Sequence, residues 1–372
     1  MRKSILFTFV FFATIGFSQN SITFPIKNNP LPTDTLRILM IGNSFTDDVT
    51  EYIGEIVQNS GIDQKTCCVY RVTQGGSQLQ TWRDKYINNT HVALEKKAGL
   101  LSMNITEGTM REILHQDWDV ISLQQLSNYS NDISTFSPYL EDLISYIKTD
   151  CTNEKVALCW HLTWSYWGGH TAMGPKEYVG WESIVSTVKD MNRTYGIDII
   201  IPSGTAIQNA RATELNTGKS LTRDGYHMDY GIGRYIIACT LYESLFQPVY
   251  EPHISDILWH PTSINDTMAI SARNCATKAV LHMDEAPLEN IDTDETYFIF
   301  PNPATDSLYI YCISDTETVH FTIHNITGKK MSKGKISTNK LSLIDTSNFP
   351  KGIYIIQLKC GKTIKTQRIE KL

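Results

Sequence analysis

Short apolar runs alternate with longer amphipathic stretches from Leu36 to about Met283. The runs are rich in Val, Ile and Leu and lack strict polar alternation, which predicts strands covered on both faces. The expected strands are residues 36–41, 67–72, 120–123, 156–162 and 197–201. The expected helices are residues 49–59, 136–148, 178–195, 231–246 and 265–283. This order predicts an α/β domain with a parallel sheet between two helical layers, and residues 91–115 are expected to form a helical insertion.

The pattern changes near residue 285, where Pro287 and a run of acidic side chains indicate a linker over 285–297. The rest of the chain has short, β-rich runs separated by turns. Strands are expected at 307–313, 319–323, 335–337, 353–358 and 364–369. Residues 298–372 are therefore predicted to form a small antiparallel β-sandwich.

The first residues have the pattern of an export signal. Arg2 and Lys3 precede an apolar run over 5–17 that ends in Ser18-Gln19-Asn20. This predicts a secretory signal peptide over 1–19, followed by the main domain over 20–284. An uncleaved N-terminal anchor is the alternative, although the run is shorter than the roughly 20 apolar residues of a membrane span. No transmembrane segment is expected later in the chain.

Composition and charge support two domains. The chain has 372 residues, of which 41% are hydrophobic and 19% are charged, which excludes a collagen, a coiled coil and a mainly disordered chain. The net charge of −6 gives no indication of nucleic-acid binding. Residues 298–372 hold 11 lysines and arginines against 5 acidic residues, a net +6, while the signal carries +2. The middle is left with −14, which argues against strongly anionic, uronate-rich ligands.

The eight cysteines leave two interpretations open. They are Cys67, Cys68, Cys151, Cys159, Cys239, Cys275, Cys312 and Cys360. An exported chain can form disulfides, but the pairing cannot be deduced from spacing, and buried free thiols are equally compatible. No CxxC pair or zinc-finger spacing occurs.

A serine follows the first expected strand at the turn into a helix, in Gly42-Asn43-Ser44-Phe45-Thr46. This is the edge of an α/β sheet where ligands bind, and a helix N-terminus there favours an oxyanion. Ser44 is therefore a candidate nucleophile, although taken alone this position is more simply explained as a helix N-cap.

A second candidate pair precedes the helix expected at 231–246. In Asp224-Gly225-Tyr226-His227, the carboxylate can reach Nδ1 of the histidine while Nε2 faces outward. That arrangement fixes the tautomer that a general base needs. A surface turn in which His227 only packs is the alternative.

Two further loops follow successive strands and should meet Ser44 at the same sheet edge. Gly75 and Gly76 follow the second strand, where the absence of a side chain lets a backbone N–H approach a reacting oxygen. Gln124 and Gln125 end the third strand, where an amide could be another donor.

Together these residues resemble the SGNH/GDSL-type hydrolases. The resemblance covers residues 36–283 and implies a flavodoxin-like α/β/α fold, with Ser44 as nucleophile, His227 as base and Asp224 as its orienting partner. It also implies an oxyanion hole from the N–H groups of Ser44 and of Gly76 or Gly75. The third block departs from the usual Gly-x-Asn-Asp and resembles the Gln-containing variant of sialate-O-acetylesterase-like members. Its side-chain donor is expected to be Gln124, then Gln125, then Asn128.

The mechanism that this resemblance implies is acyl transfer through a covalent acyl-serine, without a cofactor. A secreted carboxylic ester hydrolase acting on acylated, most simply O-acetylated, carbohydrate is the expected function. A non-catalytic glycan-binding protein on the same scaffold and a lipid or peptidoglycan esterase are the alternatives.

Aromatic residues are dense after the fourth expected strand. Trp160, His161 and Trp164 are the candidates for stacking on a sugar ring, and a buried aromatic edge of the core is the alternative. His161 and His170 lack a third ligand at suitable spacing, so no metal is expected.

The C-terminal segment contains Phe300-Pro301-Asn302-Pro303-Ala304, Asn325-Ile326-Thr327-Gly328 and Gly352-Ile353-Tyr354 in order, followed by a basic end. It resembles the type IX secretion sorting domain of the Bacteroidota, which implies handling by that machinery and delivery to the cell surface or beyond. An accessory carbohydrate-binding sandwich is the alternative, and it should expose aromatic side chains.

Overall fold

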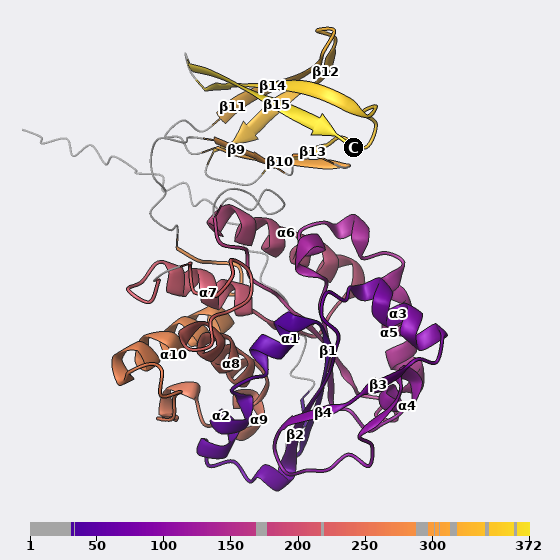
Figure 1. Cartoon of the computed structure of the whole chain (residues 1–372), viewed down its shortest axis with the longest axis vertical. Coiled ribbons are helices and arrows are strands. Elements are labelled where there is room, and N and C mark those ends of the chain that lie inside the picture. Colours follow the sequence, from indigo (N-terminus) through magenta and orange to yellow (C-terminus); the bar gives the residue numbers. More distant parts are fainter. Residues whose placement is uncertain are drawn as a thin grey trace, which may run out of the picture.

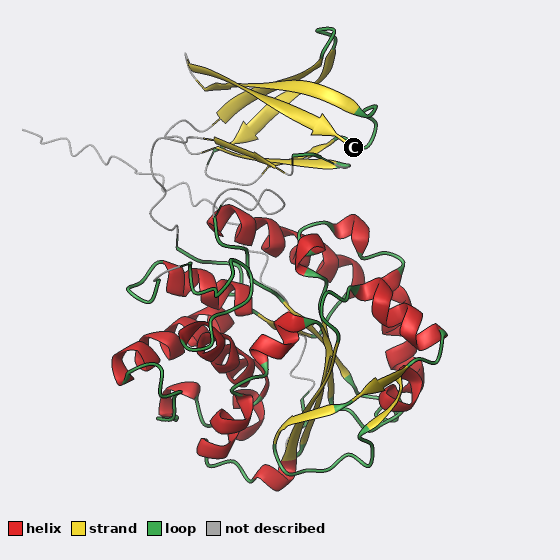
Figure 2. Cartoon of the chain, viewed as in Figure 1, coloured by secondary structure: helices red, strands yellow, loops and turns green. Residues whose placement is uncertain are grey.

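A computed structural model describes residues 31–32, 34–168, 177–216, 219–287, 297–300, 302–304, 306–312, 318–338, 342–360 and 363–372. The expected signal peptide and most of the expected linker lie outside the described residues. Helices and a sheet form the larger N-terminal part, and strands alone form the C-terminal part (Figure 2). The domain limits predicted from the sequence stay predictions.

A six-stranded sheet forms the centre of the larger part, in the order β4-β2-β1-β6-β7-β8. Its five parallel strands are β1 (Leu36–Gly42), β2 (Cys67–Thr73), β6 (Val120–Leu123), β7 (Ala157–His161) and β8 (Ile199–Ile201). In register, Leu36 lies opposite Cys67 and Ile38 lies opposite Val120. Each of the five was predicted from its apolar run, because a strand covered on both faces excludes polar side chains.

Helices cover both faces of this sheet, which confirms the predicted three-layer α/β/α fold. One face carries α1 (Ser44–Val49), α2 (Ile53–Asn59), α7 (Ser203–Arg211), α8 (Ile232–Leu245) and α10 (Asp266–Leu281), and the other carries α3 (Leu79–Ile87), α4 (Met110–Leu114) and α5 (Tyr139–Asp150) (Figure 1). Helix α6 (Glu177–Tyr195) and the short α9 (Gln247–Tyr250) complete the larger part.

Two sequence predictions need correction. The helix expected over 49–59 is two helices, because the Asn43 side chain caps a first helix that begins at Ser44 and ends at Val49, and a second helix begins at Ile53. The stretch 91–115 contains three short strands, β3 (His91–Ala93), β4 (Glu95–Ala98) and β5 (Glu107–Thr109), before its one short helix α4. Strand β4 pairs antiparallel with β2, so the sheet is mixed at this edge. Its charged side chains are typical of an edge strand.

Whether the cysteines form disulfides or stay as thiols, which their spacing left open, is visible for most of them. Cys67, Cys68, Cys151, Cys159, Cys239 and Cys275 are all buried free thiols, and Cys312 is buried. Burial raises the pKa of Cys67 and of Cys275 to about 11, so both stay protonated and pack as small apolar side chains. The side chain of Cys360 lies outside the described part.

The C-terminal part is the predicted antiparallel sandwich. One sheet has the order β13-β10-β9 and the other β12-β11-β14-β15. The strands are β9 (Tyr297–Phe300), β10 (Ser307–Cys312), β11 (Thr318–Asn325), β12 (Lys330–Ser337), β13 (Ser342–Asp345), β14 (Gly352–Cys360) and β15 (Thr363–Lys371). Strands β9 and β13 were not predicted.

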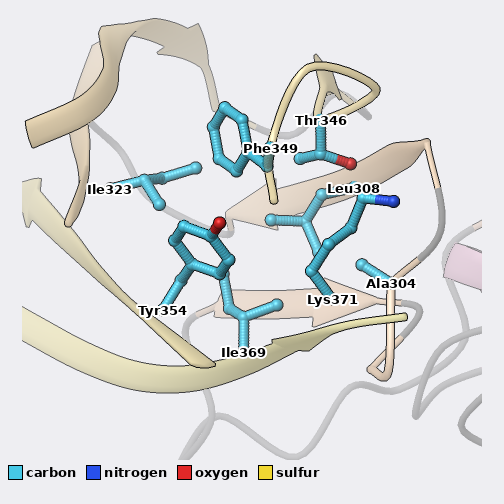
Figure 3. A pocket seen from close by; sticks show the side chains of 8 residues that line it. All are labelled: Ala304, Leu308, Ile323, Thr346, Phe349, Tyr354, Ile369 and Lys371. Carbon is cyan, nitrogen blue, oxygen red and sulfur yellow. The ribbon is translucent and has the colours of Figure 1, made fainter. Parts of the chain in front are cut away.

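The two sheets of the sandwich enclose a cavity of about 10 Å³. Leu308, Ile323, Phe349, Tyr354 and Ile369 are among the residues around it (Figure 3). A space of this size holds at most about one water molecule, so these side chains form a core rather than a ligand site. The exposed large apolar side chains in the described part of this sandwich are aliphatic: Ile326, Leu343, Ile353, Ile364 and Leu372.

Every helix in the described part of the chain is too short or too polar to cross a bilayer.

Candidate active site

Ser44 stands at the sharp turn from β1 into α1. Asn43 holds this turn, because its Oδ1 accepts a hydrogen bond from the Phe45 N–H at 3.0 Å and its Nδ2 donates to the Ser77 carbonyl at 2.9 Å. Gly42 is required for space: a Cβ there would lie 2.1 Å from Thr46 Oγ1. The turn places the Ser44 side chain at the C-terminal edge of the sheet, where ligands bind in such folds.

His227 and Asp224 lie beside Ser44 as predicted. His227 Nε2 is 2.9 Å from Ser44 Oγ, and His227 Nδ1 is 2.6 Å from Asp224 Oδ2. Asp224 Oδ1 also accepts a hydrogen bond from the His227 N–H at 2.8 Å. With the proton on Nδ1 bound to the carboxylate, the lone pair of Nε2 faces the serine hydroxyl. This geometry suits His227 to take a proton from Ser44.

The charge on Asp224 is stabilised by this arrangement. Partial burial acts to raise the pKa of its carboxyl group, but hydrogen bonds from the His227 ring and from the backbone N–H groups of His227 and Tyr226 outweigh burial and hold the pKa below its usual range. Asp224 is therefore ionised at neutral pH and can stabilise an imidazolium.

A cavity of about 490 Å³ opens beside the serine. Ser44, Gly76, Asn128 and His227 all line it, so the structure brings together the four loops that the sequence placed at this edge. Gly76 has a φ of 69°, a backbone conformation that favours glycine.

Gln124 and Gln125 do not line this cavity, contrary to their predicted role as oxyanion donors. Gln124 is buried below the turn: its Nε2 donates to Asn43 Oδ1 at 2.7 Å, and its Oε1 accepts from Thr46 Oγ1 at 2.7 Å. The Nε2 of Gln125 donates to the carbonyl and hydroxyl of Thr135, each at 3.1 Å. Both amides are thus committed to holding the fold, and neither donates toward Ser44.

Asn128, the third choice of the sequence prediction, does line the cavity. Its Oδ1 accepts a hydrogen bond from the Tyr166 hydroxyl at 2.5 Å, and that hydroxyl is also hydrogen-bonded to Ser127 Oγ at 2.7 Å. Burial raises the pKa of Tyr166 to about 12, which keeps the phenol protonated. The amide oxygen of Asn128 is therefore occupied, and its NH₂ group is available as a donor.

Trp160, His161 and Trp164 are at most 2% exposed, which contradicts their predicted role in stacking on a sugar. Trp164 instead stacks on Phe45, the residue after Ser44, with ring centroids 4.2 Å apart. Aromatic side chains that are 40–44% exposed come from neighbouring positions: Tyr129, Trp167 and Tyr226. Tyr226 belongs to the Asp224–His227 motif and Trp167 follows Trp164 by three residues, but sequence alone does not show which aromatic of a cluster faces solvent.

His161 is a neutral structural residue. Its Nδ1 is 3.0 Å from Gln124 Oε1 and its Nε2 is 3.0 Å from Ser203 Oγ. Complete burial lowers its pKa to about 3. Within the described ranges, no group of three His, Cys, Asp or Glu side chains is placed to hold a metal ion, and His170 lies outside them.

The burial of His161 predicts acid sensitivity. Between pH 6.5 and 3 the unfolded chain binds a proton at this histidine that the folded chain does not. The free energy of unfolding should therefore lose up to about 1.4 kcal/mol per pH unit below pH 6.5 from this group alone. Urea unfolding at several pH values from 7.5 to 5 should show a shallower decline for His161→Gln than for the unmodified chain. Equal slopes would contradict the assignment.

Comparisons with known proteins agree with this division of the chain. Residues 37–279 match the family model described as domain of unknown function (DUF4886), and residues 298–371 match the one described as secretion system C-terminal sorting domain. The second match confirms the predicted sorting domain, so the chain is exported by type IX secretion to the cell surface or beyond.

Solved structures add one informative relative. A DUF4886 family protein from Bacteroides uniformis is 32% identical, with 69% of this chain and 98% of that chain covered and a TM-score of 0.60. A proposed SGNH hydrolase from Slackia heliotrinireducens is 17% identical (57% and 99% covered, TM-score 0.41), and a proposed acylhydrolase from Bacteroides fragilis is 12% identical (62% and 96%, TM-score 0.30). The last two are too distant to indicate an activity. No curated protein matches the chain.

Proposed function

The chain belongs to the DUF4886 family, and on that premise we propose that its central domain is a serine esterase that hydrolyses acyl esters of carbohydrate. The observation that carries the proposal is the continuous contact from Asp224 through His227 to Ser44, with distances of 2.6 and 2.9 Å, beside an open cavity. A glycan-binding protein without catalytic activity would need none of these three groups. The resemblance to SGNH/GDSL-type hydrolases supports the same assignment.

The proposed reaction has two steps. His227 Nε2 takes the proton of Ser44 as Oγ attacks the ester carbonyl, and the resulting oxyanion is stabilised by the N–H groups of Ser44 and Gly76 and by the NH₂ of Asn128. The tetrahedral intermediate then expels the alcohol, which takes the proton from His227. In the second step a water molecule, deprotonated by His227, attacks the acyl-serine, and the acid is released as Ser44 regains its proton.

The cavity and its surroundings favour a short acyl group on a sugar. Most lining residues are small or polar, and Phe45 and Leu126 are the large apolar ones without a polar group. The exposed rings of Tyr129, Trp167 and Tyr226 offer apolar faces that match the C–H face of a pyranose. Export to the cell surface places the enzyme where it meets polysaccharide.

The test is acetate release by the full-length exported chain from acetylated polysaccharides, together with hydrolysis of p-nitrophenyl acetate and labelling by a fluorophosphonate. Turnover and labelling that Ser44→Ala abolishes would support the proposal. Failure of the unmodified chain to turn over or to be labelled would favour a glycan-binding protein, and a preference for long acyl chains over acetate would favour a lipid esterase.

Trp167 provides a test of the sugar assignment. Trp167→Ala removes one exposed ring. If a ring–sugar contact contributes about 1 kcal/mol, its removal lowers kcat/KM about fivefold. We therefore expect kcat/KM to fall about fivefold more for an acetylated oligosaccharide than for p-nitrophenyl acetate. The matched control is Leu258→Ala, which removes another exposed apolar side chain and should leave this ratio unchanged. An unchanged ratio for Trp167→Ala would contradict a sugar platform at this residue.

A further inference from the structure

We propose that Asp48 is a positioning residue, which holds the loop carrying His227 against the helix carrying Ser44. Asp48 lies one helical turn after Ser44 in α1, and its side chain is completely buried. Its carboxylate makes no hydrogen bond to Ser44 or His227 among the described residues; its partners are Arg223, Met228 and Arg234. The inference rests on the proposed function, since it concerns the geometry of that active site.

The carboxylate of Asp48 binds the loop directly. Its Oδ2 accepts a hydrogen bond from the backbone N–H of Met228, the residue after His227, at 3.0 Å. Its Oδ1 accepts one from Nη1 of Arg223, on the other side of His227, at 3.1 Å. The loop is thus bound to α1 on both sides of the histidine.

Arg234, in the first turn of α8, makes the third connection. Its Nε and Nη2 lie 2.9 and 2.8 Å from Asp48 Oδ1, so the same carboxylate also joins α1 to the helix that follows the loop. Two guanidinium groups thus face one carboxylate that is completely buried. Burying a carboxylate is unfavourable unless it is paired and hydrogen-bonded, and Asp48 is paired with both Arg223 and Arg234.

Contacts within the loop complete the arrangement. Arg223 donates from its backbone N–H to the His227 carbonyl at 2.9 Å and from Nη1 to the Met228 carbonyl. The guanidinium carbons of Arg223 and Arg234 each lie 4.8 Å from the ring centroid of Tyr230. Tyr52 in turn donates a hydrogen bond to the Tyr230 carbonyl. The backbone on both sides of His227 is therefore fixed by contacts that converge on Asp48.

This arrangement matters for catalysis because proton transfer depends on the distance between His227 Nε2 and Ser44 Oγ. A displacement of about 1 Å can reduce the rate about 100-fold. His227 and Ser44 belong to segments that are far apart in the sequence, and Asp48 joins those segments. Its loss should change kcat more than the binding of substrate.

The experiment compares Asp48→Asn with the unmodified full-length chain and with Glu51→Gln. Asparagine keeps the shape and an acceptor for the Met228 N–H, but it removes the charge and turns one oxygen into a donor that faces the arginines. We expect kcat for p-nitrophenyl acetate to fall about 10–100-fold while KM changes less than threefold. Glu51 lies 3.5 Å from Arg234 Nη1 at the surface and is the matched control, expected to retain activity.

Hydrogen exchange separates positioning from a general loss of stability. Exchange of the Met228 amide should be faster in Asp48→Asn, while amides of the central strand β1 remain protected. If Asp48→Asn does not fold, Arg234→Lys is the second variant. It keeps the positive charge but removes the two contacts that Nε and Nη2 make with Asp48, and it should also lower kcat. Unaltered kcat in a folded Asp48→Asn, or a fall explained by the unfolded fraction alone, would overturn the inference. If the unmodified chain and Ser44→Ala both showed only background activity, the proposed function would be contradicted. Exchange of the Met228 amide would still report whether Asp48 holds the loop.

Discussion

Ser44→Ala is expected to lower kcat/KM about 10⁴-fold or more, and His227→Ala should have an effect of similar size. Without Oγ no acyl-serine can form, and without Nε2 the hydroxyl has no base at 2.9 Å to take its proton. Because the two groups act as one unit, the double variant should be little worse than either single variant. Additive losses would mean that Ser44 and His227 contribute through separate steps.

The measurement is initial-rate hydrolysis of p-nitrophenyl acetate, with thermal unfolding to show that each variant is folded. Ser134→Ala is the matched control, because Ser134 lies at the surface within a short 3-10 helix and its loss should leave the rate unchanged. More than about one-tenth of the activity remaining in Ser44→Ala would exclude it as the nucleophile, since substituted nucleophiles retain far less.

The sheet was predictable because its strands are buried on both faces and so exclude polar residues. The same logic explains the omissions. Strand β4 carries Glu95, Lys96 and Lys97 at the sheet edge, which no apolar run can reveal. Helix α7 is buried along its whole length although it contains Ser, Thr, Gln and Asn, so it shows no amphipathic pattern.

The candidate active site was also predictable only in part. The proximity of Ser44, Asp224 and His227 was predictable because their positions in the chain follow from the order of strands and loops. The first choice of side-chain oxyanion donor, Gln124, was wrong because the side-chain direction at a strand end is set by packing: Gln124 contacts Asn43, Thr46 and His161 instead. Large aromatic area favours burial, which explains why Trp160 and Trp164 joined the core.

Asn128 is the proposed side-chain donor to the oxyanion. If its NH₂ group stabilises the oxyanion, Asn128→Ala should lower kcat about 10²–10³-fold, equivalent to about 3–4 kcal/mol of transition-state stabilisation. The charge it faces develops mainly in the transition state, so KM should change little. Asn128→Asp keeps the shape but replaces the donor with an acceptor beside the oxyanion, and it should be at least as damaging.

Tyr166→Phe gives the graded comparison for this prediction. It keeps the amide of Asn128 but removes the hydroxyl that orients it at 2.5 Å, so we expect a smaller loss, about tenfold, of a size typical for one hydrogen bond. The order unmodified chain, Tyr166→Phe, Asn128→Ala in falling kcat would indicate that the amide acts through its orientation. A kcat for Asn128→Ala within threefold of the unmodified chain would leave the oxyanion to the Ser44 and Gly76 N–H groups alone.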